Sequence, residues 1–528
     1  MRPFCPPRRK FVSPRTPNNL TELVKWDLAK ALLDTWFSSP GLLDHGIMLR
    51  HDFLFLRRPL GGKSRAEAAP TREKKFHLGK IAVTKNGRPF PIPACAERRE
   101  RGRGLRSIVG RVDQGEWRPA ENRPDPLLML ERINKQRLRE LVPIKMGRMA
   151  ASPFGFLRGA APLMAQDLAE WPTTGLTVQM CGDAHVGNLG AFAAPDGHLL
   201  FDLNDFDESM PGPWEWDVKR LATSLVLAGR SAGESEAGCR DAVQGFVAQY
   251  RTAMALFAEL SVFELAKFEI RRRSQIPLVR AVLSKAERAT REHLLEKLTE
   301  KKQGHRHFRF DPPLLRHVCR PVARSVIASL REYRETLGPD RQLVFDAYRP
   351  VAVAFKVAGT GSVALRNYVI LCLGRTINDA IFLQIKEAQE ACAAPYLANV
   401  TVPANNGRRI AEGQHRMQTV SDPLLGWTVI GARHFLVRQL ADHKARIDTT
   451  ELHGDTLSEY ASVCGRVLAK GHARTGDPLA LAAYCGRSDK LDRAMAKFAF
   501  AYADQTTHDY ELLLRAIRRR RVKALLQV

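Results

Sequence analysis

The chain has no paired cysteines, no long apolar run and no leader-like start. Its 9 cysteines form no CxxC pair and are odd in number, so neither a zinc ribbon nor a disulfide framework is indicated. The longest apolar stretches, such as residues 221–228, fall well short of the roughly 20 residues that a bilayer-spanning helix needs. After MRPFCPPRRKF comes no apolar segment with a small-residue cleavage site, as a secretory signal requires. We therefore expect a cytoplasmic protein in a reducing compartment, without a membrane span.

The sequence also shows no internal repeat, and its composition excludes a wholly disordered chain. Apolar residues make up 45% and charged residues 26% of the 528 positions, which is typical of globular proteins. A chain of this length is long enough for about two to four domain-sized units with ample core.

Negative charge is scarce near the start of the chain. The formal net charge is +26, and residues 1–110 hold 23 Lys and Arg against 9 Asp and Glu, which is more than half of the excess. Residues 1–104 also alternate short apolar runs with Pro and Gly, so we expect a basic, poorly ordered extension. A polyanion-binding arm is the alternative, since clustered Lys and Arg gain affinity through counterion release. Nucleic-acid binding is expected, if at all, only through this segment.

The rest of the chain divides into three regions by hydrophobic pattern. Residues 105–345 show mainly helical spacing, interrupted by short strands in TGLTVQMCGD and HLLFDLND. Residues 346–445 contain Val-, Ile- and Phe-rich runs that predict a β-rich unit, and residues 446–528 return to helical spacing. The pattern predicts an α+β fold that is predominantly helical.

The segment CGDAHVGNLGAFAAPDGHLLFDLNDFDES concentrates the side chains that could carry chemistry. It brings Asp183, Asn188, Asp202 and Asp205 within 23 residues, on a loop and at a strand end. Mg²⁺ is commonly held by one or two carboxylates together with substrate phosphates. An Asp that accepts a hydroxyl proton, an Asn five residues later and a strand-borne Asp on the metal form the catalytic half of a kinase site. An acidic turn beside a solvated strand end is the alternative interpretation.

These residues resemble the aminoglycoside phosphotransferase branch of the protein-kinase-like superfamily, whose catalytic loop reads like HGDxHxGN and whose metal strand reads like IDxxD. The resemblance implies that Asp183 is the catalytic base and that Asn188 and Asp202 hold Mg²⁺, with Asp205 assisting. The segment WEWDVKRLATSL resembles the helix in which an Asp supports the catalytic loop, which makes Asp217 a supporting candidate. A helix-start Asp stabilised by the helix dipole is the alternative for this last residue.

A nucleotide-binding half follows later in the chain. KVAGTGSVALRNYVILCLGRTINDAIFLQIK supplies a strand, a glycine turn, a second strand and a third strand that ends at Lys386. The turn consists of Gly359, Thr360, Gly361 and Ser362. Glycines let backbone N–H groups approach phosphate, and a strand lysine meets the phosphates as a point charge. We therefore assign these five residues to nucleotide binding.

A lysine in this role is held by a glutamate on the next helix. GRRIAEGQHRMQ offers Glu412, 26 residues after Lys386, while Glu387 and Glu390 are nearer alternatives. We expect Glu412, because LLGWTVIGARHFLVRQL then falls where the remaining strands of the small lobe and the hinge belong. An exposed helical glutamate without a role is the other interpretation.

The catalytic half precedes the nucleotide-binding half, which is the reverse of the usual order in a kinase. A circularly permuted, bilobal protein-kinase-like fold explains this order. Residues 105–345 then form the catalytic lobe, residues 346–445 the small lobe, and residues 446–528 the helices that complete the catalytic lobe. Permutation is tolerable because domain termini usually lie at the surface and close together.

Residues 105–528 resemble, over about four-fifths of the chain, a bacterial family named domain of unknown function 2252. The segments that carry the resemblance are RMAASPFGFLRGAAPLMAQDLA, VQMCGDAHVGNLG, FDLNDFDESMPGPWEWDVKRLATS, GTGSVALRNYVIL, FLQIKEAQEA, EGQHRMQTVSDPLLGW and LAKGHARTGD. The family name conveys no substrate, so the reaction has to be inferred from the site residues.

The sequence favours an ATP- and Mg²⁺-dependent phosphotransferase acting on a hydroxyl acceptor of unknown identity. Lys386 and the glycine turn would orient the phosphates, and Asp183 would orient or deprotonate the acceptor, so catalysis would rest on positioning and charge neutralisation. Nucleotidyl (AMP) transfer on the same fold is an alternative, and so is a nucleotide-binding regulatory protein without turnover. A nucleic-acid-binding protein is a further alternative that rests on charge alone.

Overall fold

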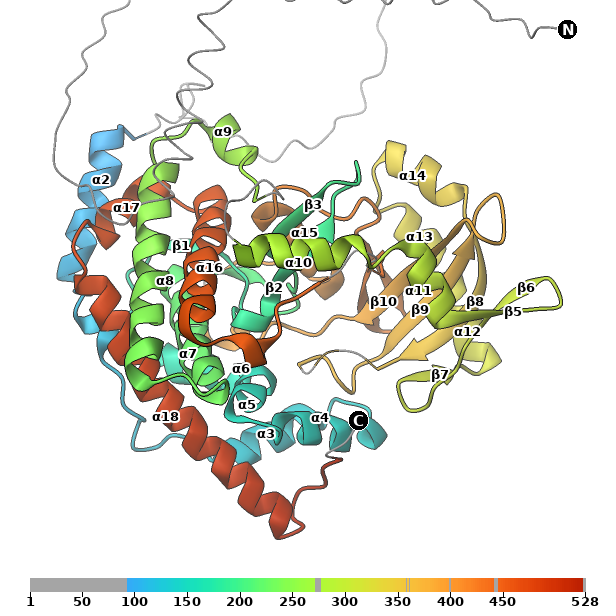
Figure 1. Cartoon of the computed structure of the whole chain (residues 1–528), viewed down its shortest axis with the longest axis horizontal. Coiled ribbons are helices and arrows are strands. Elements are labelled where there is room, and N and C mark those ends of the chain that lie inside the picture. The colour runs from blue at the N-terminus through green and yellow to red at the C-terminus, as the bar shows by residue number, and fades with distance from the viewer. Residues whose placement is uncertain are drawn as a thin grey trace, which may run out of the picture. The chain divides into compact units, whose positions relative to one another are not determined.

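The computed structural model describes residues 93–270, 277–357, 359, 361–397, 400–440 and 445–525. Residues 1–92, which make up most of the predicted basic extension, and Thr360 of the glycine turn lie outside the described residues. The described chain combines helices and antiparallel sheets (Figure 1), which confirms the predicted α+β class. We divide it into a helical lobe, residues 93–287 and 445–525, and a sheet lobe, residues 291–440.

The helical lobe is built from twelve α-helices, four short strands and several 3₁₀ turns among the described residues. Its helices are α2 (Cys95–Gly104), α3 (Pro126–Asn134), α4 (Val142–Met149), α5 (Pro153–Gly159), α6 (Ala161–Ala169), α7 (Trp214–Ser231), α8 (Glu236–Phe257), α9 (Val262–Ala266), α10 (Pro277–Glu287), α16 (Gly454–Thr475), α17 (Pro478–Cys485) and α18 (Lys490–Arg518). Its strands are β1 (Thr177–Met180), β2 (Leu189–Ala193), β3 (Leu199–Leu203) and β4 (Met210–Pro213), and they pair as β1 with β4 and β2 with β3.

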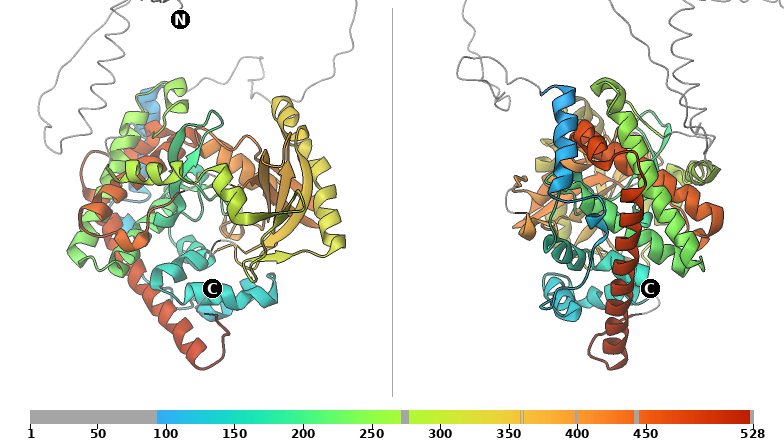
Figure 2. Two further views of the ribbon diagram at one scale, coloured as in Figure 1. Left: turned by 45° about the vertical axis from the view of Figure 1, so that its right-hand side comes forward. Right: turned by 90° about the vertical axis from the view of Figure 1, so that its left-hand side faces the viewer.

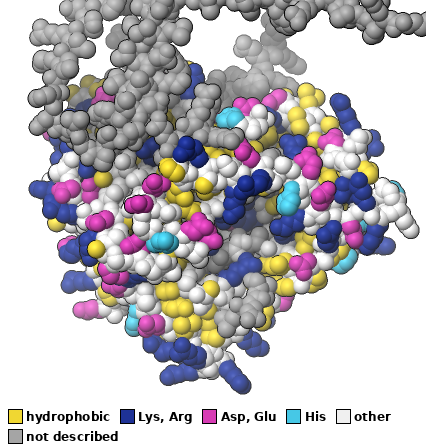
Figure 3. Space-filling view, viewed as in Figure 1, with side chains coloured by type: hydrophobic (Ala, Val, Ile, Leu, Met, Phe, Trp, Pro, Cys, Tyr) yellow, Lys and Arg dark blue, Asp and Glu magenta, His cyan; other side chains and the backbone are white. Residues whose placement is uncertain are grey.

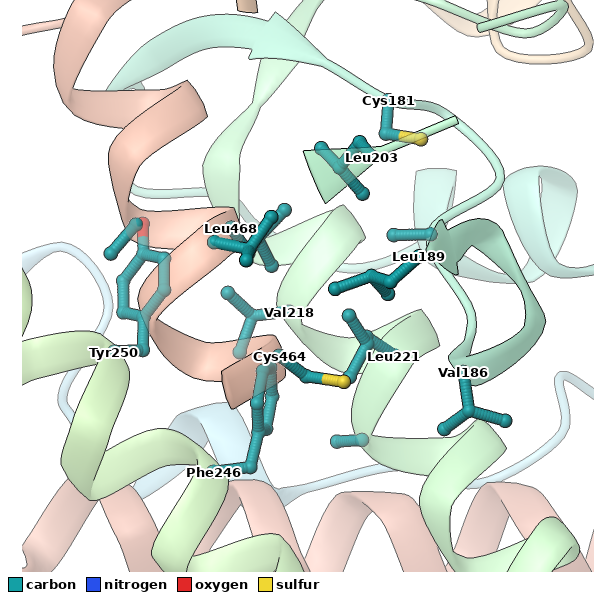
Figure 4. Packing of buried hydrophobic residues seen from close by; sticks show 14 of the residues in the cluster. Cys181, Val186, Leu189, Leu203, Val218, Leu221, Phe246, Tyr250, Cys464 and Leu468 are labelled. Carbon is teal, nitrogen blue, oxygen red and sulfur yellow. The ribbon is translucent and has the colours of Figure 1, made fainter. Parts of the chain in front are cut away.

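Helix α7 lies at the centre of this lobe and is buried from Trp214 to Gly229. A helix that is enclosed on all sides must be covered by others, and α8, α16 and α18 pack against it. Side chains from these helices and from β2 and β3 interdigitate in one continuous core (Figure 4). The turned views in Figure 2 show the long helix α18 running past α8 toward the C-terminal end. No helix within the described ranges combines the length and the apolar character that crossing a membrane requires.

The sheet lobe contains a six-stranded antiparallel sheet in the order β11-β12-β10-β9-β8-β7. Its strands are β7 (Leu315–His317), β8 (Arg349–Lys356), β9 (Asn367–Leu373), β10 (Ala380–Glu387), β11 (Gly426–Ile430) and β12 (Arg433–Gln439). Around it lie α11 (Arg291–Leu298), α12 (Arg320–Ala328), α13 (Leu330–Arg334), α14 (Pro339–Asp346), α15 (Asn406–Met417) and the hairpin of β5 (Thr299–Lys302) with β6 (His305–Phe308).

The first part of the sheet lobe differs from the helical spacing expected up to residue 345. Residues 291–346 contribute β7 to the main sheet and form the β5–β6 hairpin. These strands are three or four residues long and carry polar sequences such as TEKK and HRHF. Such segments lack the apolar alternation by which a strand is recognised in a sequence.

Successive side chains of β10 point to opposite faces of the sheet and so lie in two different environments. Leu383 and Ile385 pack into the core beneath the sheet, whereas Phe382 belongs to the cluster on the other face. Because side chains on a strand alternate, Gln384 and Lys386 share the face of Phe382. On this face, Phe382 packs in an apolar cluster, and Gln384 and Lys386, nearer the end of the strand, line a polar cavity.

We predict that Gly465→Ala lowers the melting temperature of the protein, whereas Gly245→Ala does not. Helices α8 and α16 pack closely, and a Cβ on Gly465 would overlap the carbonyl oxygen of Phe246, which belongs to the backbone and cannot move aside. Overpacking of this kind costs about 1–3 kcal/mol. A Cβ on Gly245 of α8 meets nothing within 4 Å, so this control gains helix propensity worth up to about 1 kcal/mol. Equal melting temperatures for the two variants at one scan rate would contradict the packing.

Candidate active site

A polar cavity of about 380 Å³ is lined by residues of both lobes. Of the residues selected from the sequence, it brings together Asp183, Asn188, Asp205, Gly359, Gly361, Ser362 and Lys386. It does not include Asp202 or Glu412. The lining residues come from chain segments about 200 positions apart, so only the folded chain unites them.

The loop that carries Asp183 follows β1 and is held by helix α7. The carboxylate of Asp217 accepts the backbone N–H groups of Cys181 at 2.6 Å and Gly182 at 2.9 Å. Gly182 has φ +79°, and a Cβ there would overlap the carbonyl oxygen of Glu208, so this turn requires glycine. The supporting contact predicted for Asp217 is thereby confirmed.

Asp183 forms a partly buried ion pair with Arg220 of α7. Nε and Nη2 of Arg220 lie 2.7 and 2.6 Å from Oδ1 of Asp183, and Nη2 also donates to the carbonyl oxygen of Leu157 at 2.8 Å. Burial raises the pKa of Asp183 to about 7, and the charge of Arg220 opposes that rise. A carboxyl that titrates near neutral pH is suited to accept a proton from a bound hydroxyl.

Asn188 ties the loop of Asp183 to the turn that follows β3. Its Nδ2 donates to the carbonyl oxygens of Asp183 at 2.9 Å and Asp205 at 3.3 Å. Because the amide nitrogen is engaged in this way, Oδ1 is the end of the side chain that remains able to coordinate a cation. The carboxylate of Asp205 lines the same cavity.

Lys386 is almost fully buried and faces two carboxylates from the turn after β3. Its Nζ forms an ion pair with Asp207 and lies 3.9 Å from Oδ1 of Asp205. Burial raises the pKa of Asp207, and the negative charge of Asp205 adds to this, while Lys386 acts in the opposite direction. Asp207 was not selected from the sequence, although it stands two positions after Asp205 in LNDFDES.

Glu412 does not contact Lys386, contrary to the sequence-based expectation. Its carboxylate accepts hydrogen bonds from Nε of Arg408 at 2.6 Å and Nη2 of Arg416 at 3.1 Å. Residues four apart share a helix face, so Glu412 meets two arginines of its own helix. The residue of α15 that lines the cavity is Ile410. The neighbouring Arg409 supports the site indirectly, because its buried guanidinium donates to the backbone carbonyls of residues 207, 209 and 389.

Asp202 also lies away from the cavity, unlike its neighbour Asp205. It is buried on β3, where its carboxylate pairs with Nζ of Lys470 from α16 and accepts the N–H of Leu203 at 2.9 Å. Of the two aspartates expected at the metal, only Asp205 therefore lines the cavity. The chain turns after β3, and this turn, rather than the strand itself, presents carboxylates to the cavity.

The glycine turn between β8 and β9 is fastened to the helical lobe by two arginines. Nη1 of Arg137 donates to the carbonyl oxygens of Gly361 at 2.8 Å and Val363 at 2.6 Å, and Arg148 donates to the carbonyl oxygen of Gly359. A Cβ on Gly361 would come 4.0 Å from Oδ2 of Asp183. The turn therefore lies directly beside the candidate catalytic carboxylate.

The comparisons with known proteins identify the family. The profile of domain of unknown function 2252 (DUF2252), described as an uncharacterized protein conserved in bacteria, matches residues 137–516, which is more than two thirds of the chain. The chain belongs to this family, as its sequence motifs predict. The searches of curated proteins and of solved structures find no match. The family description specifies no reaction, so function has to be argued from the cavity.

We predict strong energetic coupling between Asp202 and Lys470. Lys470→Met leaves a buried carboxylate without its partner, which costs about 3–5 kcal/mol in the free energy of unfolding. The double variant Lys470→Met with Asp202→Leu removes both charges and should recover a large part of that loss. Chemical unfolding of the two single variants, the double variant and the wild type measures the coupling. Additive effects would mean that Asp202 is not a structural partner of Lys470.

Proposed function

We propose that this protein is an ATP- and Mg²⁺-dependent phosphotransferase that acts on a hydroxyl-bearing acceptor. One observation carries the proposal: a single cavity is lined by a carboxyl suited to proton transfer, an Asn, a second Asp, a buried lysine and a glycine turn. These are the parts that kinases use to position ATP and neutralise the charge of the transferred phosphoryl group.

The order of elements in the sheet lobe supports a kinase-like arrangement. The glycine turn joins β8 and β9, Lys386 lies on the next strand, β10, and α15 comes before β11 and β12. Kinases likewise place a glycine-rich loop first, a lysine on the third strand and a helix after it. Since the loop of Asp183 precedes all of these elements in the chain, we propose a bilobal kinase-like fold in circularly permuted form.

The donor groups in the cavity fit Mg²⁺ together with a nucleotide. Mg²⁺ retains several waters and takes one or two carboxylates plus phosphate oxygens, so it needs no dedicated cage. The described ranges contain no group of three or more His, Cys, Asp or Glu side chains arranged for a metal ion, which agrees with such an open site. Oδ1 of Asn188 and the carboxylate of Asp205 would hold the ion, and bound Mg²⁺ would offset phosphate charge.

The protein's own side chains would carry out the remaining steps. Lys386 would exchange part of its interaction with Asp207 for the nucleotide phosphates. Asp183, oriented by Arg220, would accept the proton as the acceptor oxygen forms its bond to the γ-phosphorus and the bond to the ADP oxygen breaks. Arg137 and Arg148 would keep the glycine turn over the phosphates, which reduces the cost of ordering it on binding.

The alternatives have less support. Nucleotidyl (AMP) transfer would use the same residues, and no observation favours it over phosphoryl transfer. A protein that only binds a nucleotide does not need a carboxyl with a pKa of about 7 beside the glycine turn. Over most of the face shown in Figure 3, Asp and Glu side chains lie between Lys and Arg side chains, so the described residues there do not favour a nucleic-acid-binding surface.

We predict that Asp183→Asn abolishes phosphoryl transfer and leaves nucleotide binding intact. Turnover is measured as transfer from γ-labelled ATP, and α-labelled ATP in parallel reports nucleotidyl transfer. Binding is measured as the rise in melting temperature with ATP and Mg²⁺. Glu412→Gln is the control, since Glu412 lies outside the cavity, and its turnover should equal that of the wild type. Full turnover by Asp183→Asn would refute the assignment.

We further predict that transfer rises with pH through the pKa of Asp183, which is about 7, because the carboxyl must be ionised to accept a proton. Removing the positive charge of Arg220 disfavours the ionised form, so Arg220→Gln should move this rise to higher pH by about one unit or more. Arg220→Lys keeps the charge and should shift it less. The measurement is the pH profile of kcat/KM, and identical profiles for the Gln variant and the wild type would contradict the role of Arg220.

A further inference from the structure

Two arginine side chains line the cavity without a hydrogen bond or an ion pair to any described residue. They are Arg158 at the end of α5 and Arg446 at the start of the C-terminal segment. Nε of Arg158 is enclosed and unpaired. By contrast, Arg220 and Arg438 in or beside the same cavity each have side-chain partners.

Both arginines flank the catalytic loop. The guanidinium of Arg158 lies 5.8 Å from the centre of the Phe154 ring, and its Cζ is 3.8 Å from where a Cβ on Gly187 would stand. The side chain of Arg446 lies beside the start of β2, which follows this loop, with Cγ 3.2 Å from the position of a Cβ on Gly190. Lys386 and the glycine turn belong to the sheet lobe and so face the cavity from the other lobe.

Neither guanidinium forms an ion pair with a described carboxylate of the cavity lining. The carboxylates of Asp183 and Asp207 are already paired with Arg220 and Lys386. Burial lowers the pKa of Arg158, the charge of Asp183 opposes this, and the nearby charge of Arg446 lowers it further. Partly buried like charges without a directly bound counterion are unfavourable, and two guanidinium groups offer the donor geometry that binds a phosphate.

We propose that Arg158 and Arg446 bind a phosphate group of the acceptor, so that the acceptor is a phosphorylated alcohol and not a neutral one. A phosphomonoester carries about −1.5 to −2 charges at neutral pH, which matches the two arginines. The assignment rests on the proposed phosphotransferase function, in which Lys386 and the glycine turn take the nucleotide phosphates. The arginine pair would then hold the acceptor with its free hydroxyl near Asp183.

The test uses the full chain saturated with Mg²⁺ and a non-hydrolysable ATP analogue, with inorganic phosphate as the probe in calorimetric titrations. We expect phosphate to bind the loaded wild-type protein, and Arg158→Gln and Arg446→Gln each to raise its Kd at least about tenfold, on the scale of a charged hydrogen bond. Arg331→Gln is the matched control, because Arg331 is exposed on α13, and it should leave the Kd unchanged.

The outcomes separate this inference from the function on which it rests. If the analogue binds normally but phosphate does not bind, the acceptor-phosphate site alone is overturned. The same holds if phosphate binds the wild type and all variants with equal affinity. Competition between phosphate and the analogue also overturns it, because the arginines would then serve the nucleotide. Failure of the analogue itself to bind, in the wild type and in all variants, counts against the proposed phosphotransferase and the phosphate site together.

Discussion

One face of helix α7 determines the geometry of the candidate active site. Asp217, Arg220 and Ser224 follow one another at helical spacing, and they bind in turn the backbone at residues 181–182, the carboxylate of Asp183 and the N–H of Val186. The helix is buried from Trp214 to Gly229, so it cannot rotate without disturbing the core. The loop that carries Asp183 is thereby tied to a helix in the core of the lobe.

The local motifs could be predicted from the sequence because their chemistry is contiguous. Asp183 and Asn188 stand five residues apart in one loop, and the glycine turn and Lys386 are separated only by a strand, a turn and a second strand. Residues separated by so few elements remain neighbours in the folded protein. The apolar alternation of β8 to β12 likewise predicts the sheet, since each of these strands has at least one buried face.

The sequence does not predict which side chains from distant segments form ion pairs with one another. Asp202 and Asp205 look equivalent in FDLNDFDES, yet Lys470 from a distant helix neutralises one and leaves the other at the cavity. Glu412 has the expected spacing from Lys386, but two arginines on its own helix are closer. Arg446 lies more than 250 residues from Asp183, so no local pattern connects it with the loop that carries Asp183. Ion pairs depend on distances that only tertiary packing creates.

The anchoring of the glycine turn affects how the cavity can open. Arg137 and Arg148 belong to the helical lobe, while the carbonyl groups they hold belong to the link between β8 and β9. Any separation of the two lobes at this point breaks these hydrogen bonds before it disturbs either core. Widening of the cavity at this point therefore requires only that a few polar contacts at the glycine turn break, and such contacts can re-form while both lobes stay folded.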